Sequence, residues 1–232
     1  TMTPVYEDNH IIIVYKRPGE IVQGDKSGDT PLVDMVKAYI KDKYAKPGNV
    51  FCGVVHRIDR PVAGLVIFAK TSKALTRLNQ MLRDGEIHKT YRAIVKGSPQ
   101  KTEARLSHYI TSVERNNKSY AHDKPVKDSK HAELEYRTLA TGERYSLLEI
   151  KLLTGRKHQI RVQLATIGHP IKGDLKYGFP RSNHDGSISL LAYNIKFIHP
   201  VSKIPVDVTA PIPDSDPLWQ TLNNIHDNGH HQ

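Results

Sequence analysis

The sequence predicts a fold that combines β-strands with short amphipathic helices. Runs rich in β-branched and aromatic residues, such as Ile11 to Tyr15 and Leu65 to Ala69, have the length and composition of buried strands. Other segments repeat apolar residues at intervals of three and four, which places them on one face of a helix. Strand-like segments that follow one another across short turns imply antiparallel neighbours.

The first half of the chain contains two predicted helices among its strands. Thr30 is the predicted N-cap of the first helix, with Pro31 at its first helical position. Thr71 or Ser72 caps the second helix, which Gly85 closes. Their leucines, isoleucines and valines indicate core packing on one side of each helix.

The second half is predicted to contain strand 89–96, the antiparallel pair 132–140 and 145–153, helix 157–167 and the hairpin 187–198 with 204–209. Residues 97–131 form a polar, mildly basic excursion, either a phosphate-contacting hairpin or loop or a solvated insertion. Residues 214–232 have the composition of a tail, in which a last turn docks on the body.

The composition points to a polyanionic partner. Lys and Arg number 34 against 24 acidic residues, for a net charge of +10 over 232 residues, although such charge also serves solubility. We expect a single domain over residues 1–232 and a monomer.

The lone cysteine, Cys52, predicts a reducing compartment. No apolar run reaches the ~20 residues of a membrane span and no signal segment is visible, so we expect a cytoplasmic protein that does not bind membranes. Without a compact His or Cys cluster, we expect no metal.

Residues 55–71 contain the strongest candidate for an active site. Asp59 lies between Arg57 and Arg60, in a bend between predicted strands at 54–57 and 65–69. Two nearby guanidinium groups favour the ionised carboxylate, which could act as a nucleophile or a base. The alternative interpretation is an ordinary loop ion pair.

This stretch also carries a family resemblance. His56-Arg-Ile-Asp-Arg, followed by Gly64, resembles the His-Arg-Leu-Asp-Arg signature of the RluA-type pseudouridine synthases, which isomerise uridine in ribosomal or transfer RNA. Further stretches match that family in the expected order: Tyr6-Glu-Asp-Asn-His with Lys16, Lys89-Thr-Tyr-Arg-Ala, and Thr154-Gly-Arg-Lys-His-Gln-Ile-Arg through Gly168-His-Pro-Ile-Lys-Gly-Asp to Tyr177-Gly. Together these matches cover nearly the whole chain.

The resemblance implies an α+β fold, a mixed, mostly antiparallel sheet flanked by helices with a central active-site cleft, forming one catalytic domain. It implies that Asp59 initiates the reaction, that Tyr91 lies against the base and that Arg161 holds Asp59. It places substrate contacts at Arg57, Arg60, Ile160, Arg156, Lys157 and His158, with Arg60 filling the gap left by a flipped uridine. From the residues alone, Tyr91 could be core packing and Arg161 a surface arginine. Family members often carry an amino-terminal RNA-binding domain, and we expect none here.

Besides an extra residue before the proline in Lys16-Arg-Pro-Gly19, the sequence departs from the family pattern at two further places. The common Thr-Ser after the signature is Val62-Ala63 here, and the usual histidine of the Arg-Val-His-Leu stretch is Gln163. Both changes bring local hydrogen bonding or RNA preference into question.

The expected function is RNA pseudouridine synthesis at a stem-loop, with large-subunit ribosomal RNA favoured over transfer RNA. Uridine isomerisation needs no redox or group-donating cofactor, and one carboxylate can either attack C1′ or remove the 2′ proton. Glycoside hydrolysis normally requires two carboxylates, and Asp174, the other carboxylate in a matching motif, is predicted to be structural. The alternative function is that of a non-catalytic RNA-binding or folding factor.

Overall fold

We describe the protein from a computed structural model, in which residues 2–229 are described. The chain divides into two compact units. The first unit comprises the residues up to Lys89 together with Ala192–Ala210, and the second comprises Thr90–Leu191 with the residues from Pro211 onward. Strands and helices occur in both units, which confirms the predicted α+β class. That residues 1–232 form a single catalytic domain stays a prediction.

The sheet of the first unit combines strands from the first part of the chain with two strands that come much later in the sequence. Its strands are β1 (Thr3–Glu7), β2 (Ile11–Lys16), β3 (Gly53–Val54), β4 (Ala63–Ala69), β10 (Leu190–Ile198) and β11 (Pro205–Thr209). Their order is β1-β2-β4-β10-β11, with β3 also paired to β4. Strands β2 and β4 are antiparallel from Ile11 opposite Ala69 to Lys16 opposite Gly64. All seven residues of β4 are buried, as expected for a strand covered on both faces.

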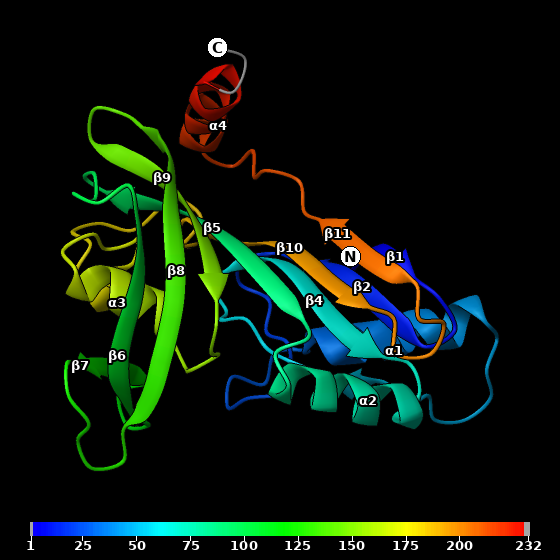
Figure 1. Ribbon diagram of the computed structural model, residues 1–232. Helices are drawn as coiled ribbons and strands as arrows, with labels where there is room; N and C mark the ends of the chain where they lie inside the picture. The colour runs from blue at the N-terminus through cyan, green and yellow to red at the C-terminus, as the bar shows by residue number, and fades with distance from the viewer. Residues whose placement is uncertain (1, 230–232) are drawn as a thin grey trace. The chain divides into compact units, whose positions relative to one another are not determined.

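Helices α1 (Leu32–Lys43) and α2 (Ser72–Arg83) lie along one face of this sheet (Figure 1). The predicted cap of α2 is confirmed, because the Thr71 hydroxyl accepts the Ala74 N–H at 3.1 Å. The predicted cap of α1 is wrong. Pro31 occupies the N-cap position and no side chain caps this helix, so Thr30 lies outside it.

The second unit contains an antiparallel sheet. Its strands are β5 (His88–Lys96), β6 (Glu103–Val113), β7 (Lys118–His122), β8 (Lys130–Thr141) and β9 (Tyr145–Leu152), in the order β5-β9-β8-β6-β7. The predicted 132–140 and 145–153 pair is confirmed as β8 and β9. Much of the polar excursion at 97–131 is sheet, because β6 pairs with both β7 and β8.

Three short helical segments complete the second unit: α3 (Gln159–Thr166), the 3₁₀ helix η1 (Leu175–Tyr177) and α4 (Pro217–Gly229). Helix α3 is shorter than predicted because His158 adopts a left-handed conformation, with φ of 57°, before it. Residues 217–229 form a helix of several turns rather than a tail with one last turn, and the expected docking is confirmed by the burial of Trp219 and Leu222. Residues 230–232 lie outside the described residues. Among residues 2–229, no helix is long and apolar enough to cross a membrane.

Candidate functional site

A tight turn in the first unit presents Asp59. The Val62 N–H donates to the Asp59 carbonyl oxygen at 2.9 Å, so the chain reverses between these residues just before β4. Ile58 and Val62 are buried on either side, whereas Asp59 is only partly buried. The turn is therefore anchored by apolar neighbours, and the side chain of Asp59 keeps some access to solvent.

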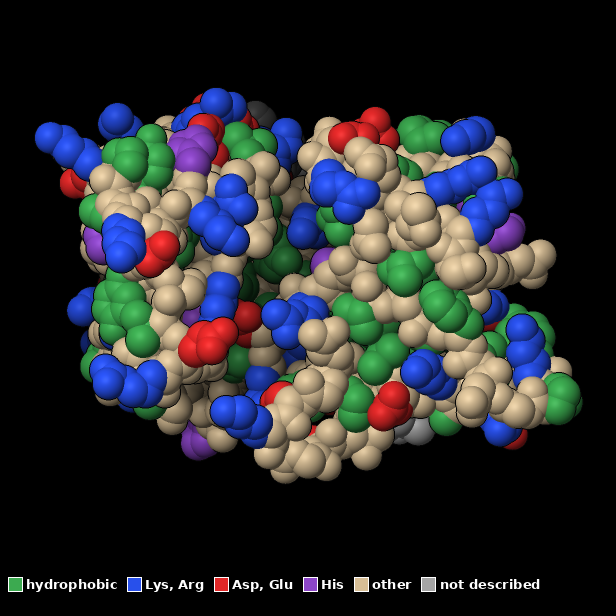
Figure 2. All heavy atoms as spheres, turned by 90° about the horizontal axis from the view of Figure 1, so that it is seen from below, with side chains coloured by type: hydrophobic (Ala, Val, Ile, Leu, Met, Phe, Trp, Pro, Cys, Tyr) green, Lys and Arg blue, Asp and Glu red, His purple; other side chains and the backbone are tan. Residues whose placement is uncertain are grey.

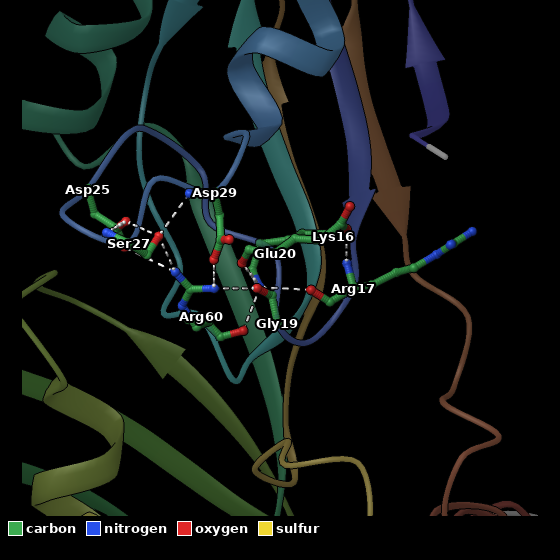
Figure 3. Close-up of polar contacts among 8 residues, drawn as sticks. All are labelled: Lys16, Arg17, Gly19, Glu20, Asp25, Ser27, Asp29 and Arg60. Carbon is green, nitrogen blue, oxygen red and sulfur yellow. Dashed lines mark hydrogen bonds and ion pairs between the residues drawn. The ribbon is translucent and has the colours of Figure 1, made fainter.

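Lys16, at the end of β2, is fully buried and bound to backbone. Its ammonium donates to the carbonyl oxygens of Arg17, Glu20 and Arg60 at 2.9, 2.7 and 2.9 Å (Figure 3). Burial lowers the pKa of Lys16 to about 7, while the charges of Glu20 and Asp59 favour the protonated form. Because one acceptor belongs to Arg60, this ammonium fastens the end of β2 to the turn that carries Asp59.

The guanidinium of Arg60 is bound to the loop that precedes α1 (Figure 3). It donates to the Gly19 carbonyl oxygen at 2.9 Å and forms ion pairs with Asp25 and Asp29 at 3.2 and 3.0 Å. The backbone carbonyl of Arg60 in turn accepts the Gly19 N–H at 2.8 Å. The insertion of Arg60 into RNA stays a prediction, and it would require these side-chain bonds to break.

The flanking arginines were predicted to favour ionised Asp59. Within residues 2–229, the ion pairs of Arg60 are those with Asp25 and Asp29, and Arg57 is exposed. The nearby cation that the sequence reasoning missed is Lys16, whose protonated form is favoured by the charge of Asp59. The sequence signal that could have indicated this buried cation was a lysine at the end of a predicted buried strand.

Two further signature residues support the turn structurally. His56 accepts the Ile67 N–H through Nε2 at 3.0 Å, and burial together with the charge of Lys89 lowers the pKa of His56 to about 3. The ring is therefore neutral at physiological pH. Gly64 has φ of +130°, and a Cβ there would collide with the backbone of Ala192. Only glycine allows β4 to approach β10 at this point.

Replacing Lys16 by Met should lower the free energy of unfolding by an amount that grows with pH. In the wild type, the unfolded chain keeps the Lys16 proton up to a pKa near 10.5, whereas the folded chain releases it near 7. Wild-type stability should therefore rise between these values, by up to about 1.4 kcal/mol per pH unit, and the variant lacks this contribution. We expect the free energy of unfolding of Lys16→Met to fall further below wild type as pH rises from 7 to 9. Urea unfolding at several pH values measures the gap, and a constant gap would contradict the burial of this ammonium.

Tyr91 lies on β5 in the second unit and is 6% exposed. The five residues from Tyr91 to Val95 are all buried, so both faces of this strand are covered. Arg92, on the face opposite Tyr91, donates to the Asn223 side-chain oxygen at 3.0 Å and lies 3.6 Å from Glu149. Helix α4 therefore contributes to covering the face that carries Arg92.

Arg161 forms a buried two-bond ion pair with Asp174. Its Nε and Nη2 donate to the two carboxylate oxygens at 2.8 and 2.9 Å. The Asp174 side chain is completely buried and that of Arg161 is 7% exposed. The interpretation of Arg161 as a surface arginine is therefore wrong. Because paired bonds fix the plane of a guanidinium, Asp174 orients Arg161. The role of Arg161 in holding Asp59 stays a prediction.

Tyr177 supports the same guanidinium from a second side. Its ring centroid lies 5.1 Å from Cζ of Arg161, in the range of a cation–π contact. Burial raises the pKa of Tyr177, so its hydroxyl keeps its proton, and this hydroxyl shares a hydrogen bond of 2.6 Å with Nδ1 of His158. The same oxygen accepts the Ser119 N–H at 2.9 Å. These contacts make Tyr177 the centre of a network that positions Arg161.

The loop before α3 is held by the amide of Gln159. This amide accepts from the Thr154 hydroxyl and the Arg156 N–H at 2.8 and 2.9 Å, and donates to the Glu133 carbonyl oxygen at 3.0 Å. The Arg156 side chain donates from Nε to the His131 carbonyl oxygen at 2.8 Å. Arg156, which was predicted to bind substrate, thus forms hydrogen bonds that hold this loop in place.

The remaining predicted contacts differ in exposure. Lys157 is exposed, whereas His158 and Ile160 are buried, at 7% and 5% exposure. Contact between these residues and RNA stays a prediction.

The departures from the family pattern lie in the protein interior. Val62 and Ala63 are 1% and 6% exposed, at the start of β4. Gln163 is completely buried, and its amide nitrogen lies 2.8 Å from Nδ1 of His108. Both departures therefore alter internal packing and hydrogen bonding, and any effect on RNA preference would be indirect.

The proposed reactive residues come from both units, with Asp59 in the first and both Tyr91 and Arg161 in the second. Within residues 2–229, no group of three or more His, Cys, Asp or Glu side chains is arranged to hold a metal ion. Cys52 is buried, which raises the pKa of its thiol to about 12 and makes a thiolate nucleophile unfavourable. Within the His56–Arg60 signature, the one carboxylate is that of Asp59, and the buried ammonium of Lys16 lies near it.

Comparison with known proteins decides the family. Residues 10–166 match the family model described as RNA pseudouridylate synthase. The chain belongs to this family. The matched residues span Asp59, Tyr91 and Arg161, and the resemblance found in the sequence motifs is confirmed.

Individual relatives agree with this family. The chain is 34% identical to the ribosomal large subunit pseudouridine synthase D of Zymomonas mobilis, over 94% of this chain and 72% of that protein. It is 31% identical to the tRNA pseudouridine synthase C of Vibrio cholerae, over 94% of this chain and 93% of that protein. For several other relatives the chain spans about two thirds of their length, as with 66% of the large-subunit synthase D of Xylella fastidiosa.

A solved structure shows the same fold. The human RNA pseudouridylate synthase domain containing 4 protein superposes with a TM-score of 0.78 at 18% identity, covering 97% of this chain and 93% of that one. At this identity the likeness concerns the fold alone. The family assignment makes this chain an RNA pseudouridine synthase, which confirms the enzyme class expected from the sequence.

Proposed function

We propose that this synthase isomerises a specific uridine in structured RNA, with Asp59 as the reactive carboxylate and without a cofactor. The observation that carries the proposal is the placement of Asp59. It lies within the family signature, on a turn that a buried ammonium anchors, with its side chain partly open to solvent.

The chemistry requires one bond to be exchanged for another. The bond from uracil N1 to ribose C1′ breaks, the base turns within its site, and C5 joins C1′ with loss of the C5 proton and gain of a proton at N1. Asp59 assists the first step, either by attack on C1′ or by removal of the 2′ proton. Tyr91 lies against the uracil, and Arg161, oriented by Asp174 and Tyr177, holds Asp59. The uridine leaves its stack to reach these groups, at a cost of a few kcal/mol.

The charge of the chain suits an RNA substrate. The net charge is +10, and on the face displayed in Figure 2 Lys and Arg side chains outnumber Asp and Glu. We favour a stem-loop of large-subunit ribosomal RNA. Relatives from Zymomonas, Xylella and Vibrio vulnificus are named as large-subunit synthases, whereas the one from Vibrio cholerae is named as a transfer RNA synthase. We further propose that the protein works as a monomer in the cytoplasm.

A comparison of pseudouridine maps tests the activity and the substrate together. Total RNA from cells with and without the gene should differ at one or a few uridines of large-subunit ribosomal RNA. Adding the purified protein to RNA from the deletion strain should restore those positions. A difference confined to a transfer RNA would overturn the ribosomal preference. Identical maps, with no conversion by the purified protein, would instead favour a non-catalytic RNA-binding factor.

A further inference from the structure

An open groove of about 620 Å³ lies within the second unit, between β7, α3 and η1. Strand β7 and helix α3 are neighbours (Figure 1). The groove is lined by Lys118 and Tyr120 of β7, Thr166 of α3, and Leu175 and Lys176 of η1, among others. Apart from Tyr177, which forms part of its floor, the groove uses none of the residues assigned above to the reaction. Nothing in the proposed chemistry requires it.

The charge of this groove, which we call the β7 groove, is entirely positive. Lys118 and Lys176 line it together with His122, and no aspartate or glutamate is among its lining residues. The Lys118 ammonium lies 5.5 and 5.7 Å from the ring centroids of Tyr120 and Tyr177. Its contacts within residues 2–229 are thus with rings rather than with a carboxylate, and its positive charge is not neutralised.

The groove also offers apolar and aromatic surface. Tyr120 is 38% exposed and Leu175 is 55% exposed, although both are large hydrophobic side chains. The Asn116 side-chain amide donates to the Tyr120 hydroxyl at 3.0 Å, which fixes the direction of the ring. A rigid, half-exposed aromatic ring beside lysines is the combination on which nucleobases stack.

The walls of the groove are fixed to one another. The Lys176 ammonium donates to the carbonyl oxygen of Asn117, in the turn between β6 and β7, at 2.8 Å. On the floor, the Ser119 N–H donates to the Tyr177 hydroxyl and the Ser119 hydroxyl donates to the Lys157 carbonyl oxygen. The groove therefore exists before any ligand arrives, which lowers the cost of binding.

We propose that the β7 groove binds a single-stranded nucleotide of the substrate RNA, separate from the uridine that reacts. The base stacks on Tyr120 and contacts Leu175, and its phosphates face Lys118 and Lys176. The volume suits one nucleotide, and the open form lets a chain enter and leave. An acidic peptide would use the lysines but would leave the exposed ring without a stacking partner. The inference rests on the proposed function, because it takes RNA as the ligand.

Binding of an unstructured RNA octamer, labelled with fluorescein, tests the groove without any need for conversion. We expect Tyr120→Leu to weaken binding by about 5- to 100-fold, the range for loss of one stacked base. Lys118→Ala should weaken binding and lower the log-log salt slope by about 0.7, as expected for one phosphate on a single strand. Lys101→Ala is the matched control and should bind RNA like the wild type. Lys101 is exposed and lies just before the start of β6, whereas β7 pairs with the other end of that strand.

Cross-linking locates the contact directly. An octamer with 4-thiouridine should cross-link to peptides that contain residues 118–122 or 175–178. Circular dichroism of each variant verifies that it is folded. Unchanged affinity and salt slope in both folded variants, or cross-links confined to other peptides, would overturn the groove proposal.

The outcomes separate this inference from the function on which it rests. If the wild type converts no uridine in cellular RNA but loses octamer binding on Tyr120→Leu, the proposed function fails and the groove stands. If the wild type converts uridine and both groove variants bind and react like wild type, only the groove proposal fails. If both hold, KM for the natural RNA should rise in the Tyr120 variant more than kcat falls.

Discussion

Asp59→Asn should leave the fold and RNA affinity of the protein nearly unchanged while removing pseudouridine formation. An amide has the shape of the carboxylate but cannot act as a base or attack C1′, so we expect a loss of at least about 10²- to 10⁴-fold, the usual contribution of such a group. The turn should survive, because its bonds involve the Val62 N–H and the Lys16 ammonium with backbone carbonyl oxygens. Single-turnover conversion of the mapped RNA site measures the effect.

The control for this variant is Asp34→Asn. Asp34 is an exposed carboxylate on α1 in the same unit, and its substitution removes the same charge. It should convert RNA like wild type. Conversion at the wild-type rate by Asp59→Asn would show that another group starts the reaction, and a loss shared by both variants would point to net charge instead.

Strands and helices were predictable where one physical signal was strong. The apolar runs of β2 and β4 are buried on both faces, so composition alone indicated strands. The Thr71 cap with its apolar helical face gave α2 correctly. The predicted strand at 54–57 is wrong beyond Val54. There the ring of His56, rather than a strand backbone, accepts the Ile67 N–H, so the ladder ends early.

The errors in the second unit have a common cause. Strands β6 and β7 are rich in polar residues, and pairing with neighbouring strands holds them in place. In β6, Ala104, Leu106 and Ile110 stand at alternate positions, but the polar composition of the segment masked this pattern. Helix α4 depends on two buried side chains, Trp219 and Leu222, and on packing against β8. Such elements are stabilised by tertiary contacts, which a pattern in the local sequence does not encode.

Motifs in the sequence identified the residues of the candidate site, whereas the residues that bind to them could be identified only from the structure. The sequence placed Asp174 in a matching motif and predicted a structural role, and its pairing with Arg161 agrees with that. The partner itself could not be predicted, because α3 and the following loop bring the two together only on folding. Lys16 was also in a motif, but a lysine is usually exposed, and only the structure shows its ammonium among backbone carbonyls.

Arg161→Ala should reduce both activity and stability. Removing the guanidinium leaves the Asp174 carboxylate completely buried without its partner, which should lower the free energy of unfolding by about 3–5 kcal/mol. If Arg161 also holds Asp59, conversion should fall by orders of magnitude even at temperatures where the variant is fully folded. Arg161→Lys should recover part of the stability and little of the activity, since one ammonium cannot reproduce the paired bonds.

The double variant Arg161→Met/Asp174→Leu separates the two roles of the arginine. It removes both charges and fills the space with apolar side chains, a change that is often neutral or stabilising for a buried pair. Its free energy of unfolding should therefore return toward the wild-type value, as urea unfolding would measure. Its rate of conversion should remain as low as that of Arg161→Ala, because the guanidinium proposed to hold Asp59 is absent from both variants. Recovery of both stability and rate would show that Arg161 serves the fold alone.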